Sequence, residues 1–238
     1  MKAWRLTLPG QMYGVLHQHL FPGDGDEHGA VILAGLAYTS RGPRLLAREL
    51  HLARDGVDYM AGKRGYRCLR AEFITPLIRK ARDQRLVYLA IHNHGGKDAV
   101  AFSSDDIASH ERGYPALLDI ANGVPVGALV FARNAVAGDI WLNSRHRTTV
   151  SEAVILGACR HVLYPSPPAD DLQADLTFDR QVRLFGDRGQ RLLSKAKVAI
   201  IGLGGGWQPA RIALGQAGCG RIRTVRPRSR RHHESSAH

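Results

Sequence analysis

The sequence predicts an α/β protein whose main domain is a mixed β-sheet flanked by helices. Residues 28–38 (HGAVILAGLAY) form a β-branched apolar run, and residues 86–91 (LVYLAI) form another, and both runs are typical of buried strands. Residues 70–85 differ, because their apolar side chains recur at helical spacing. We therefore expect helices to pack against a sheet that contains both buried strands.

The remaining elements of this domain follow from shorter patterns along the chain. The PGDGD sequence at residues 22–26 predicts a turn that ends the first helix. The other expected elements are a strand at 3–7, a helix at 11–21, strands at 44–54 and 64–70, a helix that begins near Ser104, a strand pair at 124–133 and 138–142, and one more element at 148–164.

The composition predicts a folded, cytoplasmic protein. Hydrophobic residues make up 44% of the chain, which gives no reason to expect disorder through its body. The amino-terminal segment has no continuous apolar core of the kind a secretory signal requires, and the longest apolar run, residues 31–38, is too short to span a bilayer. The three cysteines show no metal or redox spacing, and their odd number argues against a disulfide framework. No membrane partner is expected.

The formal net charge of +12 raises the possibility of nucleic-acid binding. Residues 206–238 contain seven arginines and one glutamate, so half of the excess charge falls in this short segment. A basic segment can bind phosphates by counterion release. The segment has no aromatic residue after Trp207 and no recognition motif, so nucleic acid is not the expected partner.

A candidate metal site lies in the segment IHNHGGKDAVAFSSDD, residues 91–106. His92 and His94 follow the apolar run that ends at residue 91, and side chains two apart on a strand project to the same side. Asp106 lies near the start of the next expected helix and would supply an oxygen ligand. Three protein ligands with a fourth position open are typical of a catalytic zinc site.

Other histidines have less informative surroundings. With twelve histidines in 238 residues, about one His-x-His pair is expected by chance. The second such pair, His17 and His19, falls in an expected helix, where residues two apart point in different directions. We interpret this pair, and also His110 on the helix after Ser104, as surface histidines.

The wider pattern resembles the JAB/MPN metallopeptidase family, the JAMM proteases. The His-x-His pair ends a strand and is followed by S-x-x-D, from Ser103 to Asp106, with eight residues between His94 and Ser103. The family pattern is a distant glutamate followed by HxHx(7)SxxD. Here the spacer is one residue longer, and Gly95 and Gly96 replace the common proline. The resemblance covers about residues 1–160 and implies a cytidine-deaminase-like mixed sheet flanked by helices.

The resemblance also implies a role for each motif residue. His92, His94 and Asp106 would hold Zn²⁺, which lowers the pKa of water and polarises the scissile carbonyl. Glu27 would act as general base and later protonate the leaving amine. Ser103 would donate a hydrogen bond to the oxyanion.

The assignment of Glu27 depends on its place before an apolar run that ends in glycine, EHGAVILAG, because the catalytic glutamate of the family lies on the strand ahead of the His-x-His segment. Without the downstream motif, Glu27 would be interpreted as a solvated residue at a strand entrance. Glu49, in the run RLLAREL, is the reserve candidate.

A second resemblance follows the proline-rich sequence PSPPADD, which predicts a linker at residues 165–176 after a domain at 1–164. Residues 177–205 contain FDRQVRLFG, GQRLL, KVAII and GLGG, and they resemble the start of a ThiF-like, ubiquitin-activating adenylyltransferase domain. The resemblance implies a fragment of a Rossmann-like domain, with Gly202 and Gly204 in a nucleotide-binding loop. Trp207 occupies the third glycine position, so the loop is expected to be degenerate and inactive.

A frameshift would explain why tryptophan stands at the third glycine position of the loop. Tryptophan has a single codon, TGG, and the codon of Gln208 begins with C, so a shift by one base reads GGC, a glycine codon. With permitted codons, the shifted reading of 206–237 also gives an apolar helix, a strand and an acidic DPD turn like those of the family. Residues 206–238 are therefore expected to be an out-of-frame, disordered basic tail.

Together these patterns predict a bacterial zinc-dependent peptidase or isopeptidase, deubiquitinase-like, that cleaves after the carboxyl terminus of a ubiquitin-like protein. The expected partner is that ubiquitin-like protein or its conjugates, because a segment that resembles an activating enzyme lies in the same chain. Two alternatives stay open: a non-catalytic scaffold of the same family, and an ATP-dependent, ThiF-like adenylyltransferase.

Overall fold

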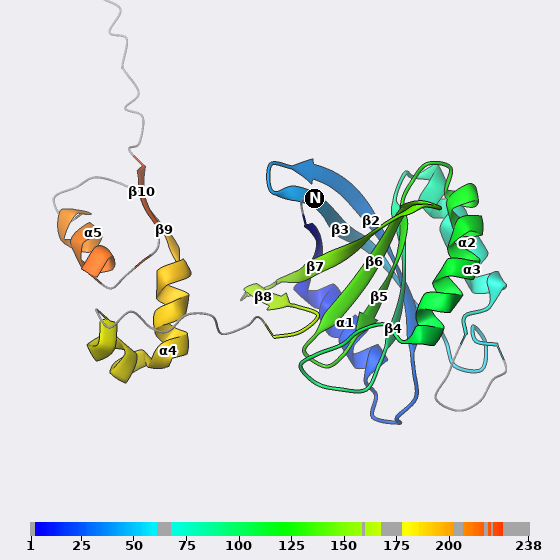
Figure 1. The fold of residues 1–238 in the computed structure, drawn as a ribbon, viewed down its shortest axis with the longest axis horizontal. Coiled ribbons are helices and arrows are strands. Elements are labelled where there is room, and N and C mark those ends of the chain that lie inside the picture. The colour runs from blue at the N-terminus through cyan, green and yellow to red at the C-terminus, as the bar shows by residue number, and fades with distance from the viewer. Residues whose placement is uncertain are drawn as a thin grey trace, which may run out of the picture. The chain divides into compact units, whose positions relative to one another are not determined.

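The computed structural model describes residues 3–60, 68–158, 160–167, 178–201, 207–216, 219 and 221–225. The chain divides into two compact units, Met1–Pro168 and Ala169–His238, and the boundary falls in the segment expected as a linker. The first unit contains the following elements: β1 (Trp4–Pro9), α1 (Gly10–Leu20), β2 (Gly29–Thr39), β3 (Gly42–Leu52), α2 (Ala71–Asp83), β4 (Val87–Asn93), α3 (Ser104–Ala121), β5 (Val126–Phe131), β6 (Val136–Asn143), β7 (His146–Leu156) and β8 (Arg160–Leu163) (Figure 1).

Seven strands of the first unit form a closed barrel in the order β1-β3-β2-β4-β5-β6-β7. Strand β1 closes it, because β1 pairs in parallel with β3 on one side and with β7 on the other. Leu6, for example, lies opposite Leu45 of β3 and opposite Ala153 of β7. Strand β8 adds to β7 in antiparallel orientation. The sheet is mixed, with β4 and β5 also parallel.

The prediction of a JAB/MPN-type, cytidine-deaminase-like sheet flanked by helices is therefore wrong. The sheet closes on itself through β1 and β7, and the unit has few helices (Figure 1). Helices α2 and α3 pack against each other on one side of the barrel. The strand patterns could not reveal this, because inward and outward side chains alternate in the same way in an open sheet and in a barrel.

The core is one cluster of buried apolar residues drawn from the barrel strands and the inner faces of the helices. Leu16 and Leu20 of α1 and Ile78 of α2 are fully buried against strand residues such as Leu6 and Leu89. Burial of apolar surface of this extent is the main driving force for folding. It gives the ends of β4 and α3 a rigid support.

Two adjacent strands approach closely at Gly127 of β5. A methyl group at Gly127 would lie 2.6 Å from the backbone oxygen of Asp139 and 2.6 Å from Cδ1 of Ile140. We expect Gly127→Ala to lower the free energy of unfolding by about 1–3 kcal/mol, since backbone has to shift, as measured by urea denaturation. The matched control is Gly14→Ala on the exposed face of α1, where nothing lies within 4 Å of the new methyl group. It should raise stability by about 1 kcal/mol, and equal effects of the two changes would contradict the close-approach argument.

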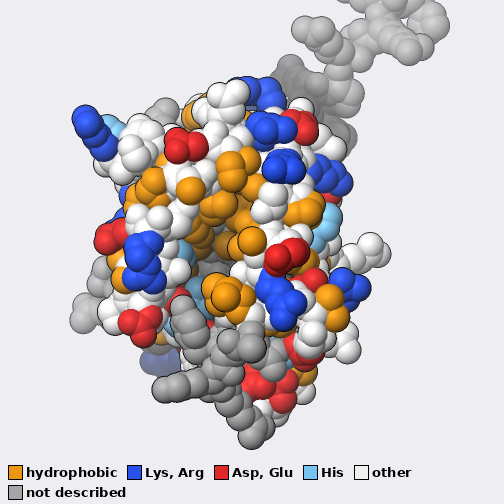
Figure 2. Space-filling model, turned by 90° about the vertical axis from the view of Figure 1, so that its right-hand side faces the viewer, with side chains coloured by type: hydrophobic (Ala, Val, Ile, Leu, Met, Phe, Trp, Pro, Cys, Tyr) orange, Lys and Arg blue, Asp and Glu red, His pale blue; other side chains and the backbone are white. Residues whose placement is uncertain are grey.

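The face that carries α2 and α3 is partly apolar. Figure 2 shows hydrophobic side chains gathered around a hollow on this side of the molecule. Both helices contribute apolar residues that are only partly buried against the core, among them Phe73, Ile74, Leu117 and Leu118. No helix among the described residues has the length and apolar character needed to cross a membrane.

The second unit contains α4 (Asp179–Lys195), β9 (Lys197–Ile201), α5 (Trp207–Gln216) and β10 (Arg221–Val225). Strands β9 and β10 pair in parallel. The prediction of a Rossmann-like fragment is also wrong, because the described residues of this unit form only a two-stranded sheet. Helix α5 and strand β10 fall within residues 206–238, for which the sequence predicts disorder. Gly202 and Gly204 lie outside the described residues.

Candidate metal centre

Strand β4 brings the two predicted histidines to the end of the barrel wall. His92 lies on β4, which pairs with β2 on one side and β5 on the other. The backbone N–H of His94 donates to the Phe131 carbonyl at 2.9 Å, so the pairing with β5 continues past the end of the strand. Both imidazoles therefore project to the same side from a backbone that is held on two sides.

Asp106 comes to the same place because helix α3 begins with a capping box. Ser103 is the N-cap: its hydroxyl oxygen accepts from the Asp106 backbone N–H at 3.1 Å, and its own N–H donates to Asp106 Oδ2 at 2.8 Å. The Ser103 hydroxyl also donates to Asp106 Oδ2 at 2.8 Å. The S-x-x-D spacing of the motif is thus the spacing that this cap requires.

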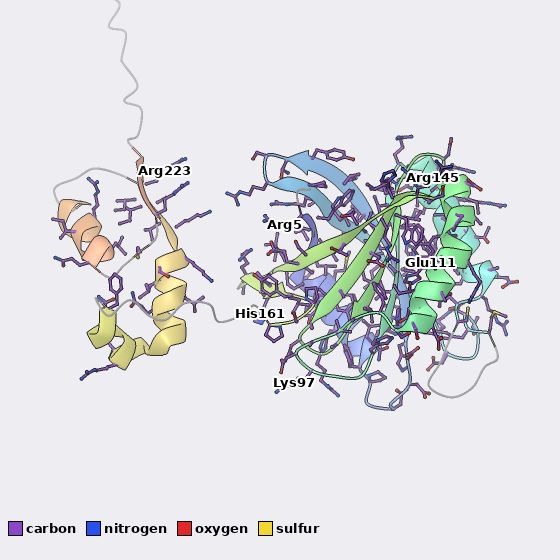
Figure 3. The ribbon with its side chains drawn as sticks, in the orientation of Figure 1. Arg5, Lys97, Glu111, Arg145, His161 and Arg223 are labelled. Atoms are coloured by element: carbon purple, nitrogen blue, oxygen red, sulfur yellow. The ribbon has the colours of Figure 1, made fainter. Side chains whose placement is uncertain are left out.

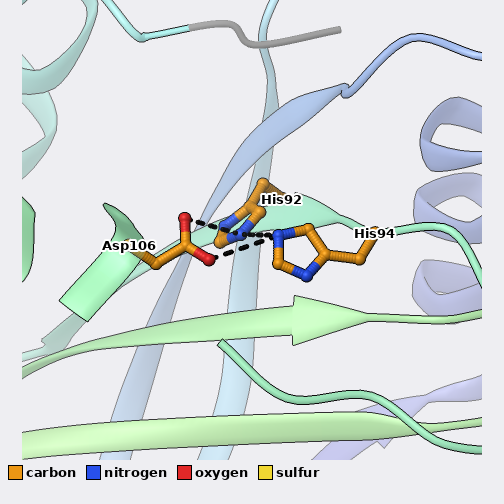
Figure 4. A group of neighbouring side chains, drawn as sticks. All are labelled: His92, His94 and Asp106. Carbon is orange, nitrogen blue, oxygen red and sulfur yellow. Dashed lines mark hydrogen bonds and ion pairs between the residues drawn. The ribbon is translucent and has the colours of Figure 1, made fainter. Parts of the chain in front are cut away.

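The structure brings the three predicted ligands together (Figure 4). The Nε2 atoms of His92 and His94 are 3.1 Å apart, and Asp106 Oδ1 and Oδ2 lie 3.3 and 3.2 Å from them, respectively. All the ligand atoms lie within 4.8 Å of one another. The expectation of a site able to hold a metal ion is confirmed, while the identity of the ion stays a prediction.

The hydrogen bonds around His94 fit a cation at this place. Its Nδ1–H donates to the Ala101 carbonyl at 3.1 Å, so Nε2 of the neutral ring carries a lone pair. That lone pair faces a carboxylate oxygen of Asp106 and the Nε2 atom of His92. Acceptors that face one another need a cation or a proton between them, and fixing the ligand tautomer through the other ring nitrogen is common at metal sites.

In the metal-free chain, protons on the imidazole rings take the place of the cation between these acceptors. Hydrogen bonding to Asp106 raises the pKa of His94, although partial burial of the ring opposes this shift. Burial alone would raise the pKa of Asp106, but the hydrogen bonds from His92 and His94 outweigh it and hold that pKa far below its usual range. The carboxylate is therefore ionised and available to a cation.

Glu27 lies beside the three ligands and not among them. Its Oε1 atom is 3.8 Å from His94 Nε2, and its side chain is 27% exposed. Asn93 holds this segment in place: its Oδ1 accepts from the His28 N–H at 2.6 Å, and its Nδ2 donates to the Asp26 carbonyl at 3.4 Å. Asn93 is not among the residues predicted from the sequence, although its place between the two histidines, on the opposite face of β4, is a usable signal.

The reserve candidate, Glu49, has other partners. Its Oε2 accepts from Lys80 at 2.7 Å and contacts His51 Nε2 at 3.0 Å. The hydrogen bond from Lys80 is the main reason why the pKa of Glu49 is lowered. Glu49 is not part of the metal-binding group.

The second His-x-His pair fastens helix α1 to the walls of the site. His17 Nε2 lies 3.1 Å from the carbonyl of Arg133, in the turn between β5 and β6. His19 Nε2 lies 2.9 Å from the carbonyl of Gly29, at the start of β2. Since residues two apart on a helix point in different directions, the two rings reach different strands.

His110 is buried, contrary to its interpretation as a surface histidine. It is 8% exposed, and its ring lies 4.7 Å from that of Tyr114 and 5.0 Å from that of Phe102, centroid to centroid. Burial lowers the pKa of His110 to about 4, so the ring is neutral at pH 7. Phe102 in turn contacts His92, with 6.1 Å between the ring centroids, so this aromatic stack supports the back of the site.

We expect Ser103→Ala to weaken metal binding without removing a ligand. The change deletes the cap of α3, at about 1 kcal/mol of stability, and deletes the hydroxyl that orients Asp106. Loss of such a supporting contact typically costs about tenfold to a hundredfold in metal affinity, which competition with a chelator would measure. Ser103→Thr keeps the hydroxyl and should bind as the parent does, and Ser104→Ala is the matched control. Unchanged affinity in Ser103→Ala would show that the hydroxyl does not orient the ligand.

No protein-family model matches the chain. No curated protein matches it. Among solved structures, the chain is similar to the solution structure of protein DSY2949 from Desulfitobacterium hafniense, with 11% identity and a TM-score of 0.40 over 63% of this chain and 92% of that one. Likeness at this level says nothing about function, so the residues of the site have to support any proposal.

Proposed function

We propose that the first unit is a zinc-dependent peptidase. The observation that carries this proposal is the convergence of His92, His94 and Asp106 within 4.8 Å, with a further carboxylate, Glu27, 3.8 Å from His94 Nε2. A carboxylate next to the ligands suits a general base, because a base has to reach water and not the ion. The proposal concerns the site and its motif, and not a JAB/MPN fold.

The donor set is compatible with zinc. Two imidazole nitrogens and one carboxylate oxygen are ligands that zinc accepts, and catalytic zinc sites have three protein ligands and an open position. A bound Zn²⁺ would polarise the scissile carbonyl and lower the pKa of water. The ligands are already held by Ala101 and Ser103, which limits the reorganisation that binding requires.

Each remaining residue has a distinct task. Glu27 takes a proton from the attacking water and transfers it to the nitrogen of the leaving amine, and Asn93 keeps the Glu27 segment against β4. The sequence motif suggested that Ser103 would donate to the oxyanion. Its hydroxyl is instead engaged with Asp106, so we assign Ser103 the task of positioning that ligand.

For the substrate, we propose the carboxyl-terminal region of a ubiquitin-like protein. Two sequence resemblances support this: the HxH and SxxD motif of the JAMM proteases, and the segment at 177–205 that resembles an activating enzyme. Because the peptidase motif and the segment that resembles an activating enzyme lie in one chain, we infer that both belong to the conjugation of a ubiquitin-like protein.

The test is cleavage of a ubiquitin-like protein that carries a short carboxyl-terminal extension, followed by mass spectrometry. The zinc-loaded chain should release the extension, and a chelator should stop the release. If no such fusion is cleaved while zinc is fully bound, the chain is a scaffold rather than a peptidase.

A further inference from the structure

A cleft of about 340 Å³ opens directly beside the proposed metal centre. Glu27, Asn93 and His94 line it, and it extends to Phe21 and Arg133. The cleft is therefore continuous with the residues that would perform the reaction. Its volume is at the low end of small-ligand pockets, so it suits about one or two amino-acid residues rather than a folded surface.

Arg133 is the cation of this cleft. The hydrogen bond between its carbonyl and His17 fixes the backbone of the turn between β5 and β6. Its guanidinium lies over the ring of Phe21, 5.6 Å from the centroid. Among the described residues, no carboxylate forms an ion pair with Arg133. Its planar group of donors therefore remains available for a carboxylate from outside the chain.

The loop between α1 and β2 supplies negative charge to the same cleft. Asp24, Asp26 and Glu27 line it. The Asp24 carboxylate contacts the imidazole of His28, whose Nε2 lies 3.0 Å from Asp24 Oδ2. The cleft thus has carboxylates from one loop and a guanidinium from another turn. A ligand with an amine at one end and a carboxylate at the other matches both.

We propose that Arg133 binds the free α-carboxylate of the segment that the reaction releases. The proposal rests on the peptidase function above. Hydrolysis adds hydroxyl from water to the acyl carbon, breaks the C–N bond and transfers a proton to the nitrogen, so the released segment acquires an amine next to Glu27. A leaving segment of about one or two residues fits the volume of the cleft, and its carboxylate would then meet Arg133, which lines the same cleft.

The substrate class that follows is a ubiquitin-like protein with a short extension that ends in a free carboxylate. An isopeptide bond to the side chain of a second folded protein is disfavoured. Gly95 and Gly96, which replace the family proline, also line the cleft. Neither glycine presents a side chain that would narrow it.

The test uses the full chain and glycylglycine as the probe. Glycylglycine amide, which lacks the carboxylate, is the comparison ligand. Binding is measured by calorimetry, first with a chelator present so that the carboxylate cannot ligate a metal, and then with zinc bound. The free acid should bind about tenfold or more tightly than the amide in both states, because hydrogen bonds to charged groups exceed neutral ones. In Arg133→Gln this preference should fall to about twofold or less.

Arg145→Gln is the matched control, since it removes the same charge. Arg145 lies in the turn between β6 and β7, at one end of the barrel, and Lys97 lies at the other end (Figure 3). Arg133 is near Lys97, because the Lys97 carbonyl accepts from the backbone N–H of Asn134, the next residue after Arg133. Arg145 is therefore remote from the cleft. The control should keep the parent's preference. Equal binding of acid and amide, no binding of either, or a preference that survives Arg133→Gln would overturn the proposal.

The two proposals can fail separately. If the zinc-loaded chain cleaves fusions with amidated and free carboxyl ends at the same rate, the carboxylate subsite is wrong and the peptidase stands. If the acid preference depends on Arg133 but no fusion is cleaved with zinc bound, the peptidase is wrong and the subsite stands.

Discussion

Glu27→Gln should abolish most of the proposed peptidase activity, while metal binding and the fold should be unchanged. Glutamine has the shape of glutamate but cannot accept a proton from the attacking water. General bases contribute about a hundredfold to ten-thousandfold in rate, so cleavage of a ubiquitin-like fusion should slow by at least about a hundredfold. Metal content should not change, since Glu27 stands outside the group of three ligands.

Glu49→Gln is the control for this change. Glu49 of β3 pairs with Lys80 of α2 and with His51 of its own strand, so the loss of its charge should affect stability slightly and leave the rate as in the parent. The matched pair separates a base from a structural carboxylate. If Glu27→Gln cleaves at the parental rate and Glu49→Gln is inactive, the base has been assigned to the wrong residue.

The group of three candidate metal ligands could be predicted from sequence because its geometry is local. His92 lies on β4 and His94 follows directly after the end of that strand, on the same side, and Asp106 is three residues after the serine that caps its helix. Each of these relations needs only a correct interpretation of one strand end and one helix start. The same reasoning could not find Arg133, because it reaches the cleft from a turn whose position depends on the whole barrel.

The fold was harder to predict for the same physical reason. Closure depends on the pairing of β1 with β7, in which Trp4 lies opposite Val150, almost the whole unit away in sequence. Apolar alternation reports which side of a strand is buried, but it does not report which strand lies next to it. Pairings of large sequence separation leave no local pattern, so most of the strands could be found while their arrangement could not. The strand expected at 64–70 is an exception, because its described residues, 68–70, form only an isolated bridge from Leu69 to Tyr59.

His92→Ala and Asp106→Asn should each remove the metal. The parent is expected to bind about one zinc per chain, and two remaining protein ligands make too weak a site to retain it through purification. Asp106→Asn keeps a side-chain oxygen that can accept from Ser103, so helix α3 should stay capped, and circular dichroism should show an unchanged fold. Elemental analysis of the purified variants measures the loss.

The matched control is His17→Ala, which should retain full metal content. The imidazole of His17 contacts the backbone carbonyl of Arg133 and lies outside the ligand group. Loss of zinc in His17→Ala together with full retention in His92→Ala would show that the wrong histidine pair has been assigned to the ion.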